Sequence, residues 1–159
     1  FGPNGTSIIV EALTDNRNRT ASNVRSAFQK SGGSMGETGS VSHAFNHYGF
    51  VRYKKDVTSE EDFFNFSIEG GAEDCFIEED TYEAVSTPET LSNLYNYLDK
   101  KFGEPVSSGF QWKPVTYVAI EGDKLKSLIN LLNELDNDED VQQVFSNFEA
   151  SDEELAKFA

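Results

Sequence analysis

Short segments with the two-residue period of β-strands alternate along the whole chain with segments that have the period of amphipathic helices. The expected strands and helices follow in the order βαβ, then βαββαβ, then βαβ. The middle block is a complete split βαβ sandwich, whereas each outer block would leave its helix face uncovered by itself. The pattern predicts an α+β protein with two ferredoxin-like α/β domains, one inserted in the other. Residues 48–114 form the inserted domain, and residues 1–47 plus 115–159 form the discontinuous domain.

Polar caps, prolines and glycines mark the expected helix ends. The clearest apolar stripe belongs to a helix with Leu or Ile at positions 125, 128, 129, 132 and 135. The expected caps are Thr20, Ser59 with Asp62, Thr87 with Pro88, and Ser151 with Glu154. The expected strands are 6–14, 40–45, 50–53, 75–77, 82–85, 109–112, 115–120 and 141–148.

The composition is typical of a folded protein, because 13% of the residues are aromatic. No apolar run approaches the ~18 residues needed to cross a bilayer, so we expect no membrane contact and a cytoplasmic location. Cys75 is the only cysteine, which excludes an internal disulfide and favours a reducing compartment. The chain begins at Phe1 without a Met or a signal segment, so we expect it to be the inside of a longer protein.

The charges are distributed unevenly within a net charge of −15. Residues 1–55 contain seven basic and three acidic residues, a net charge of +4. Residues 56–159 contain six basic and 25 acidic residues, a net charge of −19. Because an acidic surface repels phosphate, we expect any nucleic acid to contact the first third of the chain. The candidate contacts are the basic residues there: Arg17, Arg19, Arg25, Lys30, Arg52, Lys54 and Lys55.

Residues 15–20 read Asp-Asn-Arg-Asn-Arg-Thr and lie between an expected buried strand and an expected helix N-terminus. Unpaired amide groups at the positive end of that helix would be flanked by Arg17 and Arg19, which suits an anion such as phosphate. The same two arginines can instead pair with Asp15 or with carboxylates from the acidic part of the chain. Both interpretations are open at this point.

The sequence contains no motif of catalytic, metal or cofactor chemistry. Residues 32–39 are rich in glycine but lack the lysine of a phosphate-binding loop, and no nucleophile elbow is present. His43 and His47 are expected on a strand without a third metal ligand. Residues 136–140 lack the spacing of a calcium loop and are expected to be a solvated turn. We therefore expect no enzyme activity, no metal and no cofactor.

Residues 48–53, Tyr-Gly-Phe-Val-Arg-Tyr, match six consecutive positions of the RNA-recognition octamer. The two preceding positions do not match, because Asn46 and His47 stand there. The octamer also follows the first helix in that fold, whereas here it would open the inserted domain. We interpret the segment as a core strand with Phe50 inward rather than as a base-stacking surface.

A longer stretch, residues 11–20, reads Glu-Ala-Leu-Thr-Asp-Asn-Arg-Asn-Arg-Thr, after Phe-Gly-Pro-Asn-Gly at positions 1–5. With Gly-Ser-Val at 39–41, Gly-Ala-Glu-Asp at 71–74 and Asp-Val-Gln-Gln-Val at 140–144, it resembles the YebC/PmpR family. The resemblance covers essentially the whole chain. The family includes bacterial transcriptional regulators and the mitochondrial translational activator of cytochrome oxidase subunit one. One departure is Phe145-Ser146, where the family often has Tyr-His.

The resemblance implies three domains, of which a basic N-terminal helical domain would precede the residues present here. It also implies a regulator of gene expression that binds nucleic acid, either DNA or ribosomal RNA, with DNA binding in transcription regulation as the first expectation. Most phosphate contacts would come from the N-terminal domain, and Arg17, Arg19, Arg25 and Lys30 would extend that surface. One alternative is a ribosome-associated translation factor whose acidic domains dock on basic ribosomal proteins. A second alternative, a module that binds a small metabolite, rests on fold analogy alone. The family has no established catalytic residues.

Overall fold

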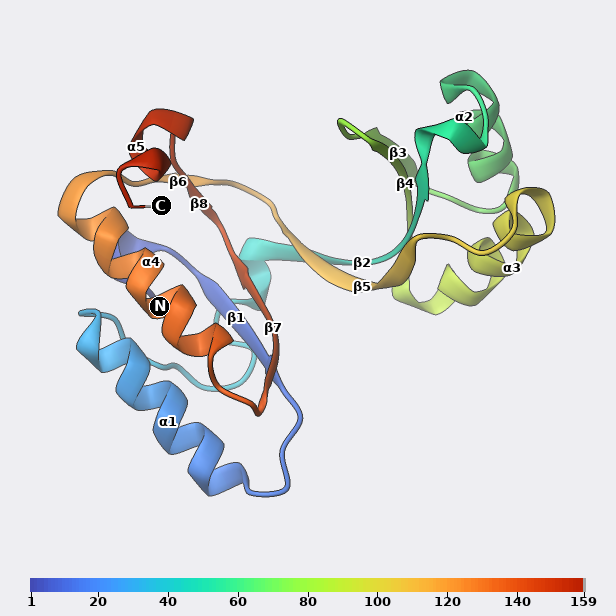
Figure 1. The fold of residues 1–159 in the computed structure, drawn as a ribbon. Helices are drawn as coiled ribbons and strands as arrows, with labels where there is room; N and C mark the ends of the chain where they lie inside the picture. The colour runs from blue at the N-terminus through green and yellow to red at the C-terminus, as the bar shows by residue number, and fades with distance from the viewer. Residues whose placement is uncertain (159) are drawn as a thin grey trace. The chain divides into compact units, whose positions relative to one another are not determined.

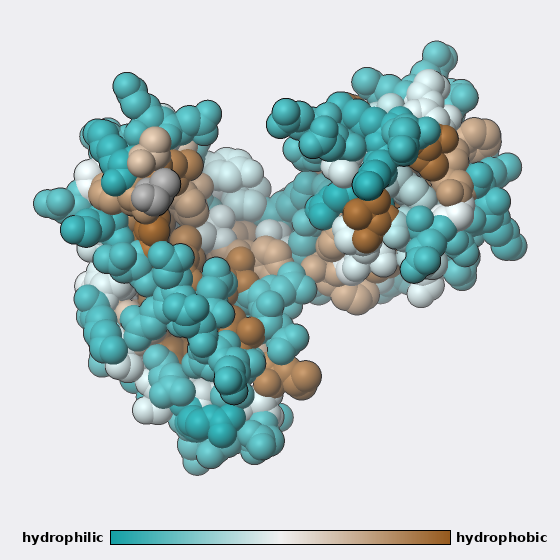
Figure 2. Space-filling model, viewed as in Figure 1, coloured by the Kyte–Doolittle hydropathy of each residue, from teal (hydrophilic) through white to brown (hydrophobic). Residues whose placement is uncertain are grey.

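A computed structural model describes residues 1–158 and confirms the α+β class. The chain divides into two compact units (Figure 1). The outer unit consists of Phe1–Asn46 and the residues from Lys113 onward, and the inner unit consists of His47–Trp112. Hydrophilic residues cover most of the visible surface of each unit, and smaller groups of hydrophobic residues are visible within each of these surfaces (Figure 2). Among residues 1–158, no helix has the length and apolar character of a membrane span.

The inner unit has a four-stranded sheet in the order β3-β4-β2-β5, in which β4 is antiparallel to both of its neighbours. This order, with the first and last strands of a βαββαβ chain side by side, is that of a ferredoxin-like fold. Its elements are β2 (Phe45–Lys54), α2 (Glu60–Glu69), β3 (Asp74–Ile77), β4 (Thr81–Ser86), α3 (Leu91–Phe102) and β5 (Ser107–Pro114).

One face of this sheet is the core of the inner unit. Val51 and Tyr53 of β2 are buried there together with Phe63 of α2 and Leu94 and Leu98 of α3. Side chains alternate along a strand, so Phe50 lies on the opposite, helix-free face, where the Arg52 guanidinium is 4.8 Å from its ring centroid. The expectation that Phe50 points inward is therefore wrong, because the alternation of β2 is shifted by one residue.

In the part that the structure describes, the outer unit combines three α-helices with two pairs of strands. β1 is antiparallel to β7, and the two-residue strands β6 and β8 are parallel. Helices α1 and α4 lie side by side along the β1-β7 pair, and their apolar faces form one core (Figure 1). The elements are β1 (Ile8–Ala12), α1 (Arg17–Lys30), β6 (Val118–Ala119), α4 (Gly122–Asp136), β7 (Val141–Ser146), β8 (Phe148–Glu149) and α5 (Asp152–Ala156).

Of the four expected caps, two are confirmed and Thr20 is wrong. Thr87 with Pro88 begins a 3-10 turn ahead of α3, without a side-chain cap hydrogen bond. Ser59 and Ser151 accept the backbone N–H groups of Asp62 and Glu154 at 3.2 and 3.1 Å, as N-cap side chains do. α1 begins earlier than expected, because the Asn16 side chain accepts the N–H of Arg19 at 3.0 Å. Asparagine caps a helix at least as well as threonine does. Thr20 therefore lies inside the helix, where its hydroxyl is available for another contact.

Three expected strands of the outer unit differ from the structure. Residues 40–44 are not a strand, because Ser42–Ala44 form a 3-10 turn in which the Ser42 hydroxyl donates to the Gly39 carbonyl at 2.9 Å, and Phe45 is the first residue of β2. The turn still buries Val41 and Phe45, the two residues whose spacing mimicked a strand. Of residues 115–120, only Val118–Ala119 are a strand. Buried Asn147 divides 141–148, because its side chain accepts the Ser7 N–H at 2.8 Å.

Candidate nucleic-acid interface

Helix α1 carries all four candidate phosphate contacts of the outer unit. Its 14 residues include Arg17, Arg19, Arg25 and Lys30 and no acidic residue. Thr20, Val24, Ala27 and Phe28 recur at helical spacing and are buried, which orients the helix on α4 and leaves its other positions exposed. The sequence periodicity thus determines which side of this cationic helix solvent can reach.

The N-terminus of α1 is closed by its own loop. The Thr14 hydroxyl accepts the N–H of Asn16 at 3.0 Å, and the Asn16 side chain accepts the N–H of Arg19 at 3.0 Å. In these bonds, side-chain oxygens accept the backbone N–H groups that would otherwise be available to a bound anion. The expected anion site at residues 15–20 is therefore partly filled from within.

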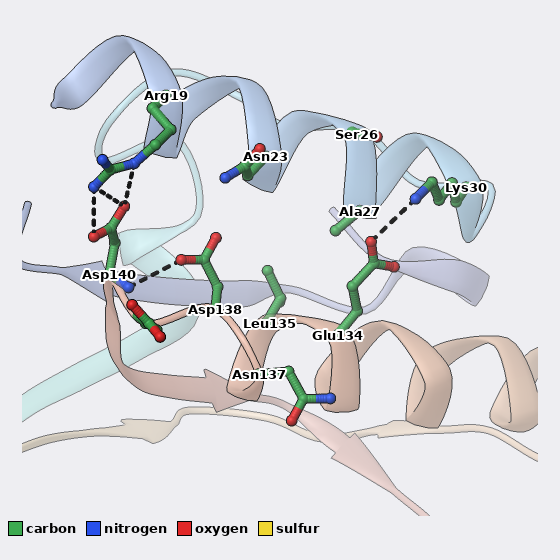
Figure 3. Close-up of a pocket in the computed structure, with 11 residues that line it drawn as sticks. Arg19, Asn23, Ser26, Ala27, Lys30, Glu134, Leu135, Asn137, Asp138 and Asp140 are labelled. Carbon is green, nitrogen blue, oxygen red and sulfur yellow. Dashed lines mark hydrogen bonds and ion pairs between the residues drawn. The ribbon is translucent and has the colours of Figure 1, made fainter.

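Arg19 belongs to an ion pair that crosses from α1 to the start of β7. Its Nη2 atom lies 2.9 Å from both carboxylate oxygens of Asp140, and its Nε atom lies 3.2 Å from Oδ2 (Figure 3). It also lies 3.2 Å from Asp15. The Thr20 hydroxyl is 2.7 Å from Asp140 Oδ2. The hydrogen bond from Thr20, followed by the Arg19 guanidinium, lowers the pKa of Asp140 below its ordinary value.

An open groove of about 560 Å³ separates this side of α1 from the C-terminal end of α4. Figure 3 shows Arg19, Asn23 and Lys30 along one wall and Glu134 and Asp140 along the other. Lys30 Nζ lies 3.3 Å from Glu134 Oε1. Both cations that line the groove are therefore compensated by carboxylates. This confirms for Arg19 the alternative in which it pairs with Asp15 and with the acidic part of the chain, whereas the Lys30 pair was not predicted.

The two remaining basic residues of α1 do not line the groove and have no carboxylate partner among the described residues. Arg17 and Arg25 are exposed, and neither forms an ion pair with any residue that the structure describes. By the helical repeat, Arg25 shares its flank with the exposed side chains of Asn18, Ser22 and Gln29. Arg17 is exposed because it lies in the first turn, about 80° around the helix from Arg25 at 3.6 residues per turn. We call Arg17, Asn18, Ser22, Arg25 and Gln29 the outer flank of α1, a surface of hydrogen-bonding groups and two cations without an ion pair among the described residues.

The three candidate contacts of the inner unit have different environments. Arg52 Nη2 lies 2.6 Å from Oε1 of Glu83, whose side chain is only 3% exposed, and Arg52 Nη1 lies 3.3 Å from the Ser107 hydroxyl. Gln111 donates to the same Glu83 oxygen at 3.3 Å. Arg52 is therefore a structural residue of the sheet. Lys54 is exposed and Lys55 is half-buried.

Sequence reasoning missed Asp140 and interpreted residues 136–140 as a solvated turn. The segment is a turn, because the Asp138 side chain accepts the Asp140 N–H at 2.9 Å. Its last residue nevertheless binds α1. Asp140 is 121 residues from Arg19 in sequence, so no local pattern could have indicated the pair. Within the part of the chain that the structure describes, no group of three His, Cys, Asp or Glu could hold a metal ion.

The lowered pKa of Asp140 predicts an acid-sensitive outer unit. A carboxylate whose pKa is lowered by folding contributes stability above its unfolded pKa and loses it as the pH falls through the folded value. We expect Asp140→Asn to lower the melting temperature at pH 7 and to flatten its decrease below about pH 4. Thermal unfolding followed by circular dichroism at several pH values measures both effects. Glu139→Gln, which makes the same charge change at an exposed neighbour, is the control, and an identical pH profile for the two variants would contradict the prediction.

Comparison with known proteins gives two findings. A protein-family model described as the second and third domain of TACO1/YebC matches residues 1–148. The crystal structure of a conserved hypothetical protein from Aquifex aeolicus has the same fold, with a TM-score of 0.82 and 37% sequence identity. That match covers 96% of this chain and 63% of the other chain. The chain therefore spans less than two thirds of the length of this relative.

Proposed function

The chain belongs to the TACO1/YebC family of transcriptional-regulator-like proteins, and from this premise we propose that it binds DNA through the outer flank of α1 to regulate gene expression. In this proposal the chain recognises nucleic acid, catalyses no reaction and works in the cytoplasm. The observation that carries the proposal is the charge of α1. In a chain of net charge −15, a 14-residue helix has four basic residues and no acidic residue.

The pairing of these four cations selects the surface that would contact phosphate. Arg19 and Lys30 already have carboxylate partners in the groove. A phosphate would have to compete with those partners, whereas Arg17 and Arg25 can bind it directly. Asn18, Ser22 and Gln29 add neutral donors and acceptors of the kind that contact phosphates and base edges.

The spacing along the helix is compatible with a duplex. Arg17 and Arg25 are eight residues apart in sequence, or about 12 Å along the helix axis at 1.5 Å per residue. This distance is close to the ~12 Å width of the major groove of B-DNA. The two positions are also about 80° apart around the helix, so their guanidinium groups project in different directions and can reach phosphates on separate strands. Such contacts position a protein without reading sequence.

The double variant Arg17→Ala/Arg25→Ala tests the proposal. Each phosphate contact contributes about −0.9 to the slope of log affinity against log salt concentration, because neutralising a phosphate releases its counterion. Loss of two contacts should therefore reduce the magnitude of the slope by about 2. Fluorescence anisotropy of a labelled DNA duplex, titrated with the 159-residue chain at several salt concentrations, measures the slope. Lys124→Ala/Lys126→Ala, an equal charge loss at exposed positions of α4, should change it by less than about 1.

The same titration includes a structured RNA of similar length. Equal effects of the two double variants, or a salt slope near zero for the unmodified chain, would contradict binding through the outer flank of α1. Tighter binding of the RNA, with the same sensitivity to Arg17 and Arg25, would contradict the proposed DNA target and favour a role in translation.

A further inference from the structure

Helix α2 of the inner unit exposes two large apolar side chains one turn apart. Phe64 is 48% exposed and Ile68 is 43% exposed. Residues four apart on a helix lie on the same side, so these two side chains are neighbours. Large apolar residues that occur singly on a surface need no explanation, whereas contiguous apolar patches mark interaction sites when they are large.

The packing of α2 explains why these residues are outside the core. Phe63 and Ser67 are fully buried beneath the helix. Phe66 packs edge-on against Phe102 of α3, with ring centroids 5.8 Å apart. By the 3.6-residue repeat, Phe64 and Ile68 lie on the side of α2 opposite Phe66. They therefore face away from α3.

A third exposed apolar residue lies on β3, which α2 contacts and which forms the edge of the sheet. Ile77 of this strand is 42% exposed. It lies on the same sheet face as Cys75, which packs against the core beside α2, because side chains two residues apart share a face. We call Phe64, Ile68 and Ile77 the apolar margin of the inner unit.

The surroundings of the apolar margin are strongly acidic. Residues 56–99 contain 13 Asp and Glu and no Lys, Arg or His. Glu60 and Glu61 occupy the first turn of α2, and Glu78 and Glu79 directly follow Ile77, all of them exposed. This charge repels nucleic acid, anionic lipid and a second copy of the same surface. It attracts a cationic partner.

We propose that the apolar margin binds a lysine- or arginine-rich protein segment. Apolar side chains of that segment cover Phe64, Ile68 and Ile77, and its cations pair with the surrounding carboxylates. Such an interface has an apolar centre and a charged rim, in which the centre supplies most of the affinity and the rim supplies specificity. The inference is independent of the outer flank of α1, because it uses residues of the inner unit only.

Fluorescence anisotropy with three labelled 16-residue peptides tests both parts of the surface. The peptides alternate Lys with Leu, Lys with Ser, and Glu with Leu. The Lys-Leu peptide should bind most tightly, because it alone combines apolar side chains with positive charge. Comparable binding of the Lys-Ser peptide would overturn the apolar part of the proposal, and comparable binding of the Glu-Leu peptide would overturn the electrostatic part.

Variants then locate the binding surface. Phe64→Ser/Ile68→Ser should weaken binding of the Lys-Leu peptide about tenfold, because two apolar contacts are lost. The matched control is Leu13→Ser/Tyr117→Ser, which removes two exposed apolar residues of the outer unit and should change affinity less than about twofold. Equal losses in the two double variants would overturn the proposal.

A charge variant tests the proposal without altering α2. Glu78→Gln/Glu79→Gln should weaken binding of the Lys-Leu peptide about threefold at low salt and less at high salt. Asp136→Asn/Glu139→Gln makes the same charge change at exposed positions of the outer unit and should have a smaller effect. A larger effect of this control pair would place the basic peptide elsewhere and overturn the proposal.

Discussion

Replacing Phe63 with alanine is expected to lower the free energy of unfolding of the inner unit by about 4 kcal/mol. Phe63 has no exposed surface. Its ring centroid lies 4.9 Å from that of Tyr82 and 6.1 Å from those of Tyr53 and Phe102. Truncation removes these contacts and leaves a cavity that two strands and a helix cannot easily close.

Urea denaturation followed by tryptophan fluorescence measures this loss, because Trp112 is the only tryptophan and belongs to the inner unit. Phe64→Ala is a closely matched control. It truncates the same side chain one residue later on α2, where the ring is half exposed, and should cost less than about 1 kcal/mol. Similar losses in the two variants would show that Phe63 is not a core residue.

Replacing Arg52 with alanine is expected to lower the stability of the inner unit by about 2 to 3 kcal/mol. The guanidinium lies 2.6 Å from the almost fully buried carboxylate of Glu83. Removal of Arg52 leaves this carboxylate without its counter-charge in a poorly solvated site. The expected loss is smaller than for a completely buried pair, because 34% of the Arg52 side chain remains exposed. The same urea titration measures it.

Two further variants distinguish a structural role of Arg52 from a role in binding nucleic acid. Lys54→Ala, an equal charge loss at an exposed position of the same strand, should leave stability almost unchanged. Arg52→Met/Glu83→Leu removes both charges and should recover much of the stability that Arg52→Ala loses. A loss of DNA affinity in folded Arg52→Ala, with unchanged stability, would contradict the structural role and restore Arg52 as a phosphate contact.

The features that sequence reasoning predicted correctly depend on residues close together in the chain. Ser59 with Asp62 and Ser151 with Glu154 cap helices through bonds that span three residues. Apolar spacing indicated the buried positions 125, 128 and 135 of α4 for the same reason. Errors arose where two local solutions compete. Val41 and Phe45 are buried on either side of a 3-10 turn, with the same spacing that a strand would give them. Asn16 and Thr20 are both residues that cap helices well, and Asn16, four residues earlier, is the one that caps α1.

The roles of the candidate basic residues were beyond the reach of such patterns. All seven have the same chemistry in the sequence, and the positive balance of residues 1–55 treats them alike. In the structure, Arg19 meets a carboxylate 121 residues away, Lys30 one 104 residues away and Arg52 one 31 residues away. Arg17 and Arg25 meet none among the described residues. Their contact with nucleic acid stays a prediction.

The sequence by itself determined the order of the helices, the order of the inner-unit strands along the chain, two helix starts and the family, because backbone periodicity, capping and motif identity are properties of neighbouring residues. Only the tertiary structure decided which cations are compensated and which apolar residues stay exposed. An ion pair forms where the returning chain brings a carboxylate within about 4 Å, and a helix flank is buried only if another element packs on it. These outcomes depend on distances through space, which separation along the chain does not specify.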